Sequence, residues 1–158
     1  MVRLVPMTAT EFQTYLARAI DDYAQEHVQA GNWLPEEAHQ KSEQEFKQLL
    51  PDGPASKDQH LFSIEEGSSG TKIGMLWFAV NRRGSHLTAF IYDFIIDEAY
   101  RGQGYGRQTL TALDAQAASM GIETISLHAF AHNPTAIALY QKMGYAITDV
   151  HMSKKLTP

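Results

Sequence analysis

Three strand-forming runs follow one another between residues 61 and 96, and only short turns separate them. Leu61–Ile64, Lys72–Val80 and Leu87–Ile96 are rich in β-branched and aromatic residues. The connecting segments, Gly67–Gly70 and Arg82–Ser85, are polar and contain glycine. Parallel neighbours need a crossover of a dozen or more residues, so these runs predict an antiparallel meander at the centre of the fold.

The elements on either side of the meander are mostly helical. Thr8 and Glu11 have the spacing of a capping box, and apolar residues recur at helical spacing from Phe12 onward. The other expected elements are a strand Val2–Met7, helices ending at Gly31 and before Pro51, a helix 105–120, a strand Thr124–Ala129, a helix from Asn133 to before Gly144, and strands Tyr145–Thr148 and Val150–Leu156. This order, βααβββαβαββ, predicts an α/β (α+β) fold with a central mixed, mostly antiparallel sheet flanked by helices.

Length and composition narrow the class of protein. The 158 residues, 44% of them hydrophobic and 20% charged, predict one globular domain over residues 1–158. The net charge of −5 argues against nucleic acid or an anionic membrane as a partner. We expect a cytoplasmic protein, since no segment is apolar enough to cross a bilayer and residues 1–7 lack the apolar stretch of a signal peptide. The absence of cysteine excludes disulfides, Cys-ligated metals and a thiolate nucleophile.

A glycine-rich loop joins the third run to the following helix. Arg101 is followed by Gly102, Gly104 and Gly106, so the backbone can approach a ligand closely and aim several N–H groups at one point. The helix that begins there adds its free N–H groups and its positive dipole end, which predicts a phosphate site. Arg107 stands where a dinucleotide fingerprint needs its third glycine, and the Lys-Ser/Thr of a Walker loop is missing.

A second motif follows about thirty residues later. It consists of Asn133, Ala136, Leu139-Tyr140 and Gly144-Tyr145, in the pattern Asn-x-x-Ala-x-x-Leu-Tyr-x-x-x-Gly-Phe/Tyr. Together with Arg-x-x-Gly-x-Gly at Arg101–Gly106, it resembles the GNAT superfamily of acetyl-CoA-dependent N-acetyltransferases. The resemblance implies the element order given above and a transfer of acetyl from acetyl-CoA to a primary amine. A homodimer is also compatible with it, since GNAT proteins are often dimers.

The resemblance assigns roles to residues of both motifs. It implies that main-chain groups of Phe94, Ile95 and Ile96 contact the pantetheine arm and the thioester carbonyl. It implies that the loop holds the pyrophosphate through the N–H groups of Gly102, Gln103, Gly104, Tyr105 and Gly106, with charge from Arg101 and Arg107. Asn133 is expected to cap the last helix, and in the family it also contacts pantetheine. Tyr140 corresponds to the general acid that protonates the leaving thiolate, although its helical stripe also suits a core aromatic.

The chemistry also needs a group that removes a proton from the amine, because an amine like that of lysine is protonated at neutral pH. With no cysteine to form an acyl-enzyme, direct attack in a ternary complex is the expected route. Some family members place a glutamate on the fourth strand, but Phe90 occupies that position here. The base therefore stays open among water and five residues: Asp93, expected to point away from Phe94; Tyr92, expected to share the face of Phe94 and Ile96; Glu26; His27; and His128.

The sequence leaves two other functions open. A non-catalytic acyl-CoA-binding module on the same scaffold is the main alternative, and a nucleotide-binding domain is the next. We expect no metal site, because His128 and His132 lie on a strand and the following loop rather than on one helix face. The acceptor stays open among a peptide N-terminus, a lysine, a polyamine and an antibiotic amine.

Overall fold

The computed structural model describes residues 1–157. The elements follow the order β1 (Val2–Pro6), α1 (Ala9–Gln29), α2 (Pro35–Leu49), η1 (Gly53–Ala55), β2 (Gln59–Glu66), β3 (Lys72–Arg83), β4 (His86–Ile96), η2 (Glu98–Tyr100), α3 (Tyr105–Ser119), β5 (Ile122–Leu127) and α4 (Pro134–Lys142). The sheet order is β1-β2-β3-β4-β5. Strands β1 to β4 are antiparallel neighbours and β5 is parallel to β4. The predicted meander and the mixed α/β fold class are confirmed.

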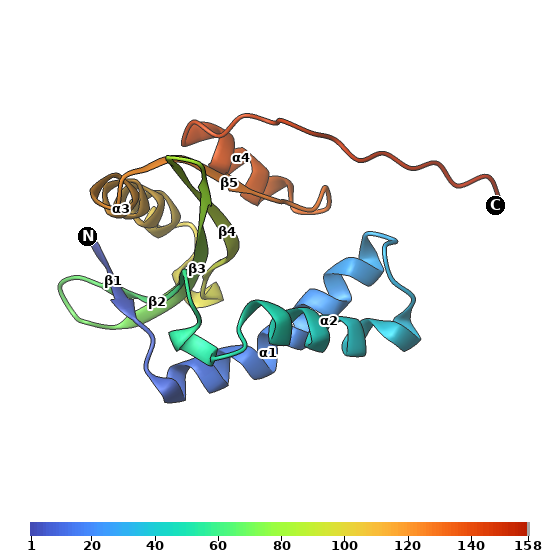
Figure 1. Ribbon diagram of the computed structural model, residues 1–158, viewed down its shortest axis with the longest axis horizontal. Coiled ribbons are helices and arrows are strands. Elements are labelled where there is room, and N and C mark those ends of the chain that lie inside the picture. The colour runs from blue at the N-terminus through green and yellow to red at the C-terminus, as the bar shows by residue number, and fades with distance from the viewer. Residues whose placement is uncertain (158) are drawn as a thin grey trace.

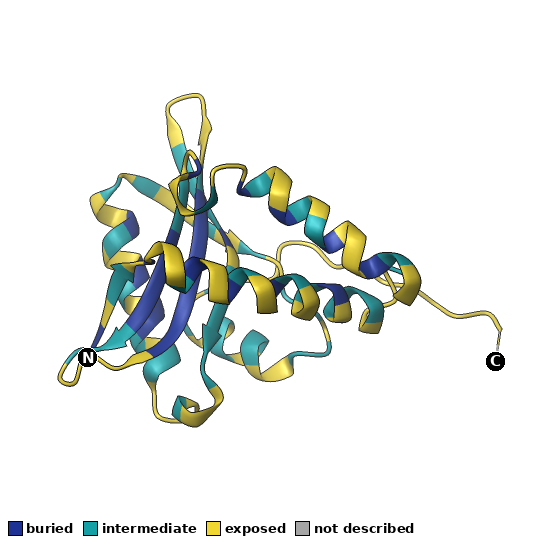
Figure 2. Ribbon diagram, turned by 90° about the horizontal axis from the view of Figure 1, so that it is seen from below, coloured by how far each residue is buried: buried dark blue, intermediate teal, exposed yellow. Residues whose placement is uncertain are grey.

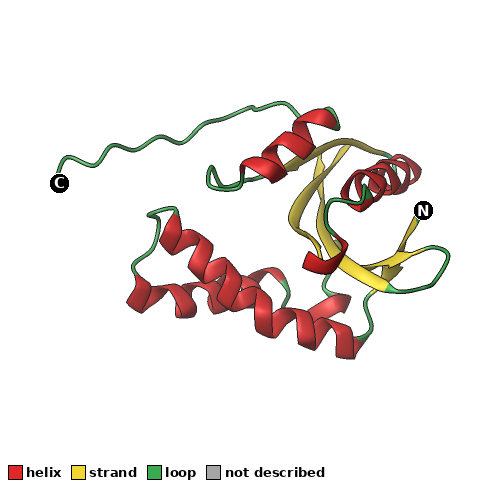
Figure 3. Ribbon diagram, turned by 180° about the vertical axis from the view of Figure 1, so that it is seen from behind, coloured by secondary structure: helices red, strands yellow, loops and turns green. Residues whose placement is uncertain are grey.

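Helices cover both faces of the sheet, α1 and α2 on one side and α3 and α4 on the other (Figures 1 and 3). Side-chain alternation in the strands explains why each face can hold a core. On β3, Met75 and Trp77 pack toward α1 and α2, whereas Leu76 and Phe78 belong to the cluster on the α3 side. The central strands therefore hold most of the buried residues (Figure 2).

The start of α1 forms as the sequence predicts. The Thr8 hydroxyl accepts from the Glu11 N–H at 3.1 Å, and the Glu11 carboxylate accepts from the Thr8 N–H at 2.9 Å. This reciprocal pair satisfies two N–H groups that would otherwise lack partners. It fixes the first turn of a 21-residue helix that begins near the end of β1 and runs beside α2 beyond the sheet (Figure 1).

The last part of the fold differs from the prediction. Residues 145–148 and 150–156 form no strand, and Tyr145–Thr157 run as an extended tail without pairing. An alternating segment becomes a strand only when another strand's free edge lies beside it, and this tail leads away from the sheet (Figures 1 and 2). The strand predicted over Thr124–Ala129 also begins and ends two residues earlier, so His128 and Ala129 lie in the loop after β5.

No helix among residues 1–157 is long and apolar enough to cross a membrane.

Candidate active site

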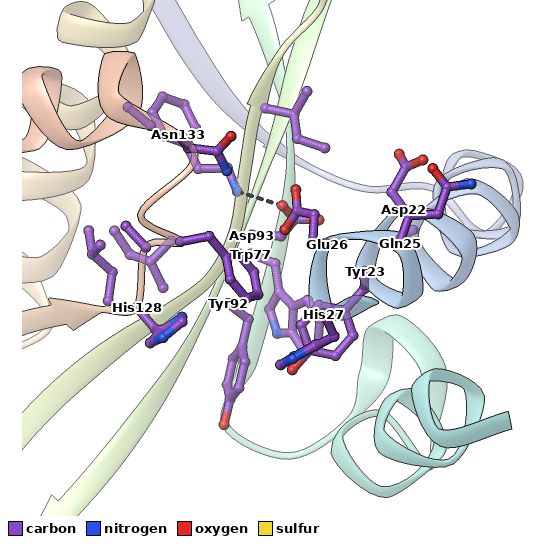
Figure 4. A pocket seen from close by; sticks show the side chains of 18 of the residues that line it. Asp22, Tyr23, Gln25, Glu26, His27, Trp77, Tyr92, Asp93, His128 and Asn133 are labelled. Atoms are coloured by element: carbon purple, nitrogen blue, oxygen red, sulfur yellow. Dashed lines mark hydrogen bonds between the residues drawn. The ribbon is translucent and has the colours of Figure 1, made fainter. Parts of the chain in front are cut away.

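A cleft of about 960 Å³ opens where β4 and β5 separate. The two strands pair only as far as Ile91 and Leu127, so the rest of β4 has β3 on one side and the cleft on the other. The walls come from α1, α2, β4, the loop after β5 and the start of α4 (Figure 4). Ten of the predicted site residues line this cleft. They are Glu26, His27, Tyr92, Asp93, Phe94, Ile95, Arg101, His128, Asn133 and Tyr140.

A β-bulge shapes the middle of β4. Trp77 lies opposite Asp93 and Phe78 lies opposite Ile91, so Tyr92 has no partner on β3. Two consecutive residues at a bulge can point to the same face of a sheet. The Tyr92 ring stacks on Trp77 at a centroid distance of 4.7 Å, on the face covered by α1 and α2.

The bulge overturns one prediction and agrees with another. Tyr92 does not share the face of Phe94 and Ile96, which both pack in the core cluster on the α3 side. Strict alternation of side chains does not hold here, because β4 contains an extra residue at the bulge. Asp93 does point away from Phe94, because its carboxylate meets Tyr15 of α1.

The Asp93 carboxylate is held by two donors. The Tyr15 hydroxyl donates to Oδ2 at 2.7 Å, and the Phe94 N–H donates to Oδ1 at 3.0 Å. Burial raises the pKa of Asp93, and these two hydrogen bonds oppose the rise. With both oxygens engaged, Asp93 fixes the bulge and contributes negative charge to the cleft. The Phe94 N–H, one of the predicted main-chain contacts, is correspondingly already in use.

Glu26 lies on α1 and faces the cleft close to Asp93 (Figure 4). Its side chain is half-buried and makes no hydrogen bond among the described residues. Burial, followed by the nearby charges of Asp93 and Asp22, raises its pKa above the ordinary glutamate value. A carboxylate with a raised pKa and free oxygens has the properties of a general base.

The two predicted histidine candidates lie against an aromatic part of the cleft wall. His27 stacks on Trp33 at 4.0 Å and meets the Phe130 ring edge-on at 5.1 Å. Its Nδ1 lies 3.0 Å from the Asn32 amide nitrogen. That nitrogen can only donate, so Nδ1 accepts and Nε2 carries the proton. Burial lowers the pKa of His27, which keeps the ring neutral. His128 packs edge-on against Phe130 at 5.1 Å.

The glycine loop follows η2 directly. Gly102 and Gly104 have φ angles of 74° and 85°, and a side chain at either place would meet nothing within 4 Å. These glycines provide a left-handed turn whose outer surface is open to a ligand. The Arg101 Nε donates to the Ile96 carbonyl at 2.7 Å, which ties the loop to the end of β4 and leaves the remaining guanidinium N–H groups available.

The rest of the loop passes into α3. The Gln103 amide donates to the Ala99 carbonyl at 3.3 Å, Tyr105 begins the helix, and Arg107 is exposed in its first turn. Gly106 is needed for packing, since a Cβ there would come within 2.9 Å of the Leu139 side chain on α4. The loop residues therefore meet at the free N-terminal end of α3, as an anion site requires.

Asn133 and Tyr140 reach the cleft from α4. Asn133 occupies the N-cap position, but its side chain makes no capping hydrogen bond. The predicted capping role is therefore wrong, and the amide faces the cleft instead (Figure 4). The Tyr140 ring lies 6.4 Å from that of Phe94. Burial, with a smaller effect from Asp93, raises its pKa to about 12, so the phenol keeps its proton at neutral pH.

Sequence reasoning missed two residues that α1 and α2 bring to the cleft. Tyr15 of α1 and Glu45 of α2 lie beside or on its walls, together with Asp22 and Tyr23 of α1. A signal was present: Tyr15, Ala19, Asp22 and Glu26 recur at intervals of three or four, so carboxylates interrupt an otherwise apolar helix face.

Among residues 1–157, no group of three His, Asp or Glu side chains could hold a metal ion.

A mixed sheet that separates over a cleft, with an arginine–glycine loop opening the next helix, defines the class as an acetyltransferase of the GNAT type. A family model described as the Acetyltransferase (GNAT) family matches residues 14–145. The chain belongs to this family.

Similar proteins support the assignment. The chain is 47% identical to the uncharacterized N-acetyltransferase YycN of Bacillus subtilis over 98% of this chain and 99% of that protein. It is 24% identical to mycothiol acetyltransferase of Corynebacterium aurimucosum over 89% of this chain and half of that protein. The crystal structure of YycN covers the whole chain with a TM-score of 0.94 and 46% identity. Glucosamine-6-phosphate N-acetyltransferase of Arabidopsis thaliana shares the fold alone, with a TM-score of 0.57 and 16% identity.

Proposed function

We propose that this protein transfers the acetyl group of acetyl-CoA to a cationic primary amine by direct attack within a ternary complex. The observation that carries the proposal is the cleft itself. Its lining includes Arg101, which leads into the glycine loop, acidic and aromatic side chains of α1, α2 and β4, and the Tyr140 phenol. Arg101 and the loop beside it suit a coenzyme phosphate, and the acidic side chains suit a protonated amine.

The loop end suits coenzyme A. Gly102 and Gly104 present backbone without side chains, and the N-terminal end of α3 favours an anion. The separated part of β4 suits the pantetheine arm, because no strand of the described chain pairs with its cleft side beyond Ile91. Asn133, which is not engaged in capping, is the polar side chain best placed to contact that arm.

The acceptor end is strongly acidic. Its described lining includes the carboxylates of Asp22, Glu26, Glu45 and Asp93, and the Arg18 guanidinium beside them lies 3.9 Å from Asp22. Aromatic side chains complete the walls and can contact an alkyl-ammonium group through their faces. They are Tyr23, Trp77, Tyr92 and Phe130. This combination favours an amine that carries a second positive charge, such as a diamine or a polyamine.

We assign the base role to Glu26. Asp93 has both oxygens occupied, and His27 presents a protonated Nε2. The Tyr92 phenol has a pKa raised further by burial, which makes it a poor acceptor of a proton. Glu26 has free oxygens and a raised pKa, and it can act directly or through one water.

The nitrogen of a protonated amine loses two protons in the reaction. Glu26 takes the first, the neutral nitrogen forms a bond to the thioester carbon, and the carbon–sulfur bond breaks as the carbonyl re-forms. Tyr140, whose pKa of about 12 ensures that its proton is present, gives that proton to the leaving sulfur, and the second proton released by the nitrogen restores it through solvent. Glu26 returns the first proton to solvent, so the products are the amide, coenzyme A thiol and one free proton. Most of the acceleration then comes from holding both substrates in one cleft.

One variant tests coenzyme binding, and a second separates an enzyme from an acyl-CoA-binding module. Gly104→Glu places a carboxylate in the proposed phosphate site and strains a φ of 85°, so acetyl-CoA binding measured by calorimetry should fall at least about 100-fold. Tyr140→Phe should leave the Kd for acetyl-CoA within about twofold and lower kcat by about 100-fold. A wild-type protein that binds acetyl-CoA but releases no thiol with any amine would support the module instead. Tight binding of ATP or NAD, with none of acetyl-CoA, would support a nucleotide-binding domain.

The acceptor class is tested with a panel of amines and thiol release as the readout. Spermidine and 1,5-diaminopentane should give a kcat/KM at least about tenfold above that of pentylamine, which has the same alkyl length as the diamine but one charge. KM for the diamine should rise with salt, because charge attraction at an open cleft is screened. A preference for neutral arylamines would contradict the proposed acceptor class while leaving the acetyltransferase assignment intact.

A further inference from the structure

A row of aromatic rings crosses the cleft from α2 to the loop after β5. Phe46 of α2 meets Tyr23 of α1 at a centroid distance of 5.8 Å, and Tyr23 meets His27, one turn further along α1, at 4.5 Å. His27 then meets Phe130 of the loop at 5.1 Å, with the two ring planes at 90°. These distances and edge-on orientations are those of aromatic pairs in direct contact. The ring bridge formed by His27 and Phe130 therefore joins the helical layer to the loop on the other side of the cleft.

The His27 half of the ring bridge is held by the turn that follows α1. The chain turns at Gly31, whose φ is 82°, and the Asn32 N–H donates to the His27 carbonyl at 2.9 Å. The turn stacks the Trp33 ring on His27 at 4.0 Å and brings the Asn32 amide nitrogen to 3.0 Å from Nδ1. Moving the imidazole out of the cleft would break both contacts, so the ring stays in place.

The Phe130 half is held by its own loop. His128 meets the ring edge-on at 5.1 Å, and His132 stacks on it at 5.3 Å. The Asn133 N–H donates to the Phe130 carbonyl at 3.0 Å, which closes the turn that leads into α4. A side chain packed on several sides has little room to change its rotamer. The ring bridge is consequently a fixed part of the cleft wall.

Tyr92 reaches the same cleft from β4 (Figure 4). Its ring stacks on Trp77 at 4.7 Å, so this side chain is also held in place. Together with His27 and Phe130 it lines the acceptor end with rings from three parts of the fold: α1, β4 and the loop after β5. Rings that are fixed by their neighbours give this part of the cleft a fixed width.

The volume of the cleft limits the acceptor further. The whole cleft measures about 960 Å³, and a pocket for a single small ligand typically measures about 300–1,000 Å³. An acetyl-CoA arm and an amine have to share this space, which leaves room only for a small acceptor. An unbranched methylene chain can lie along the faces of the rings. A wider group next to the amine would collide with the ring bridge.

We propose that the ring bridge selects the acceptor by its width, admitting free unbranched diamines and excluding amines attached to a ring, a sugar or a peptide backbone. The inference rests on the proposed function, because it concerns the same acceptor end, and it narrows the acceptor to one class of small molecule. His27 and Phe130 are then specificity-determining residues. One methylene in a fitted pocket changes selectivity by about 10–200-fold, so a much wider acceptor should be strongly disfavoured.

Two diamines with the same charges test the effect of width. 1,5-Diaminopentane and 1,3-bis(aminomethyl)cyclohexane both place five carbons between their nitrogens, but the second carries a cyclohexane ring. In calorimetry with coenzyme A present, the wild-type Kd for the linear diamine should be at least about tenfold below that for the cyclic one. The kcat/KM values from thiol release should show the same preference.

Removing either half of the ring bridge should admit the cyclic diamine. In Phe130→Ala and in His27→Ala, the cyclic diamine should bind more tightly and the ratio of the two Kd values should fall below about threefold. The double variant should go no further, because each single change already opens the same contact. Tighter binding cannot result from partial unfolding. His132→Ala is the matched control, since this imidazole also packs on Phe130 but lies outside the described lining of the cleft, and it should keep the wild-type ratio.

The possible outcomes separate this inference from the proposed chemistry. Equal wild-type Kd values for the two diamines, binding of neither diamine, or a ratio that Phe130→Ala leaves unchanged would overturn the role of the ring bridge. The expected Kd ratios without thiol release from any amine would support the ring bridge and reject the proposed transfer. Thiol release from both diamines with equal kcat/KM would support the transfer and reject the ring bridge.

Discussion

The Tyr15 hydroxyl is one of two donors that hold the half-buried Asp93 carboxylate, at 2.7 Å. Tyr15→Phe keeps the ring, which is 4% exposed and packed in the core on the α1 side, but leaves one carboxylate oxygen without its partner. We expect the free energy of unfolding in urea to fall by about 1.5–3 kcal/mol, the range for hydrogen bonds to charged groups. Tyr100→Phe, whose hydroxyl makes no hydrogen bond among the described residues, should cost less than about 0.5 kcal/mol.

Glu26 has opposite effects on stability and on activity. Because the pKa of Glu26 is raised, the folded state binds the carboxyl proton more tightly than the unfolded state does. The fold therefore loses stability as the pH rises from the unfolded-state pKa of about 4.3 through the folded-state pKa. Glu26→Gln should therefore raise the Tm at pH 8 and leave it unchanged near a pH of about 3.5, as measured by calorimetry.

The same variant should remove the general base. We expect the wild-type kcat/KM to fall at low pH as Glu26 becomes protonated. Glu26→Gln should lower kcat by about 100-fold, and its pH profile should no longer show this fall at low pH. Gln25→Glu is a useful control, because it adds a carboxylate on α1 beside the cleft without changing Glu26. Wild-type turnover in Glu26→Gln would show that another residue or water accepts the proton.

Among the elements, α3 and α4 approach closely at one point. A Cβ on Gly106 would lie 2.9 Å from the Leu139 side chain and 4.0 Å from the Phe94 ring. Gly106→Ala should therefore cost about 1–2 kcal/mol of stability and lower kcat, since α4 carries Tyr140 and must move. In a Leu139→Ala background the contact is gone, and the same change should stabilise the protein by about 0.5–1 kcal/mol through its helix propensity. Urea unfolding of the four chains tests this change of sign.

Local sequence signals located most elements correctly because the causes were local. The Thr8–Glu11 box begins α1, and the glycine loop begins α3, as spacing alone predicted. The bulge at Tyr92 could not be seen in this way. An extra residue in β4 is revealed only by its register with β3, and it decides which face receives Tyr92.

At the scale of the whole molecule, coenzyme binding links stability to ligand concentration. The Tm of the protein should rise by several degrees when acetyl-CoA is present at about 100 times its Kd, because a ligand that binds only the folded state stabilises it by about 2.7 kcal/mol. Gly104→Glu, which disrupts the proposed phosphate site, should show a Tm that does not change with acetyl-CoA. Scanning calorimetry or fluorimetry at several acetyl-CoA concentrations makes this comparison. A wild-type Tm that does not change with acetyl-CoA would argue against the proposed coenzyme site.

The sequence by itself determined the antiparallel meander, the order of elements as far as α4, and the family, because turn residues, capping pairs and glycine spacing act over a few residues. Only the tertiary structure decided that Asn133 faces the cleft, that Asp93 is bound by Tyr15 across 78 positions of sequence, and that Glu26 lies free beside it. It also decided that the last alternating segment forms no strand in its own chain. These features depend on which surfaces meet when the helices pack on the sheet, and no local spacing records that.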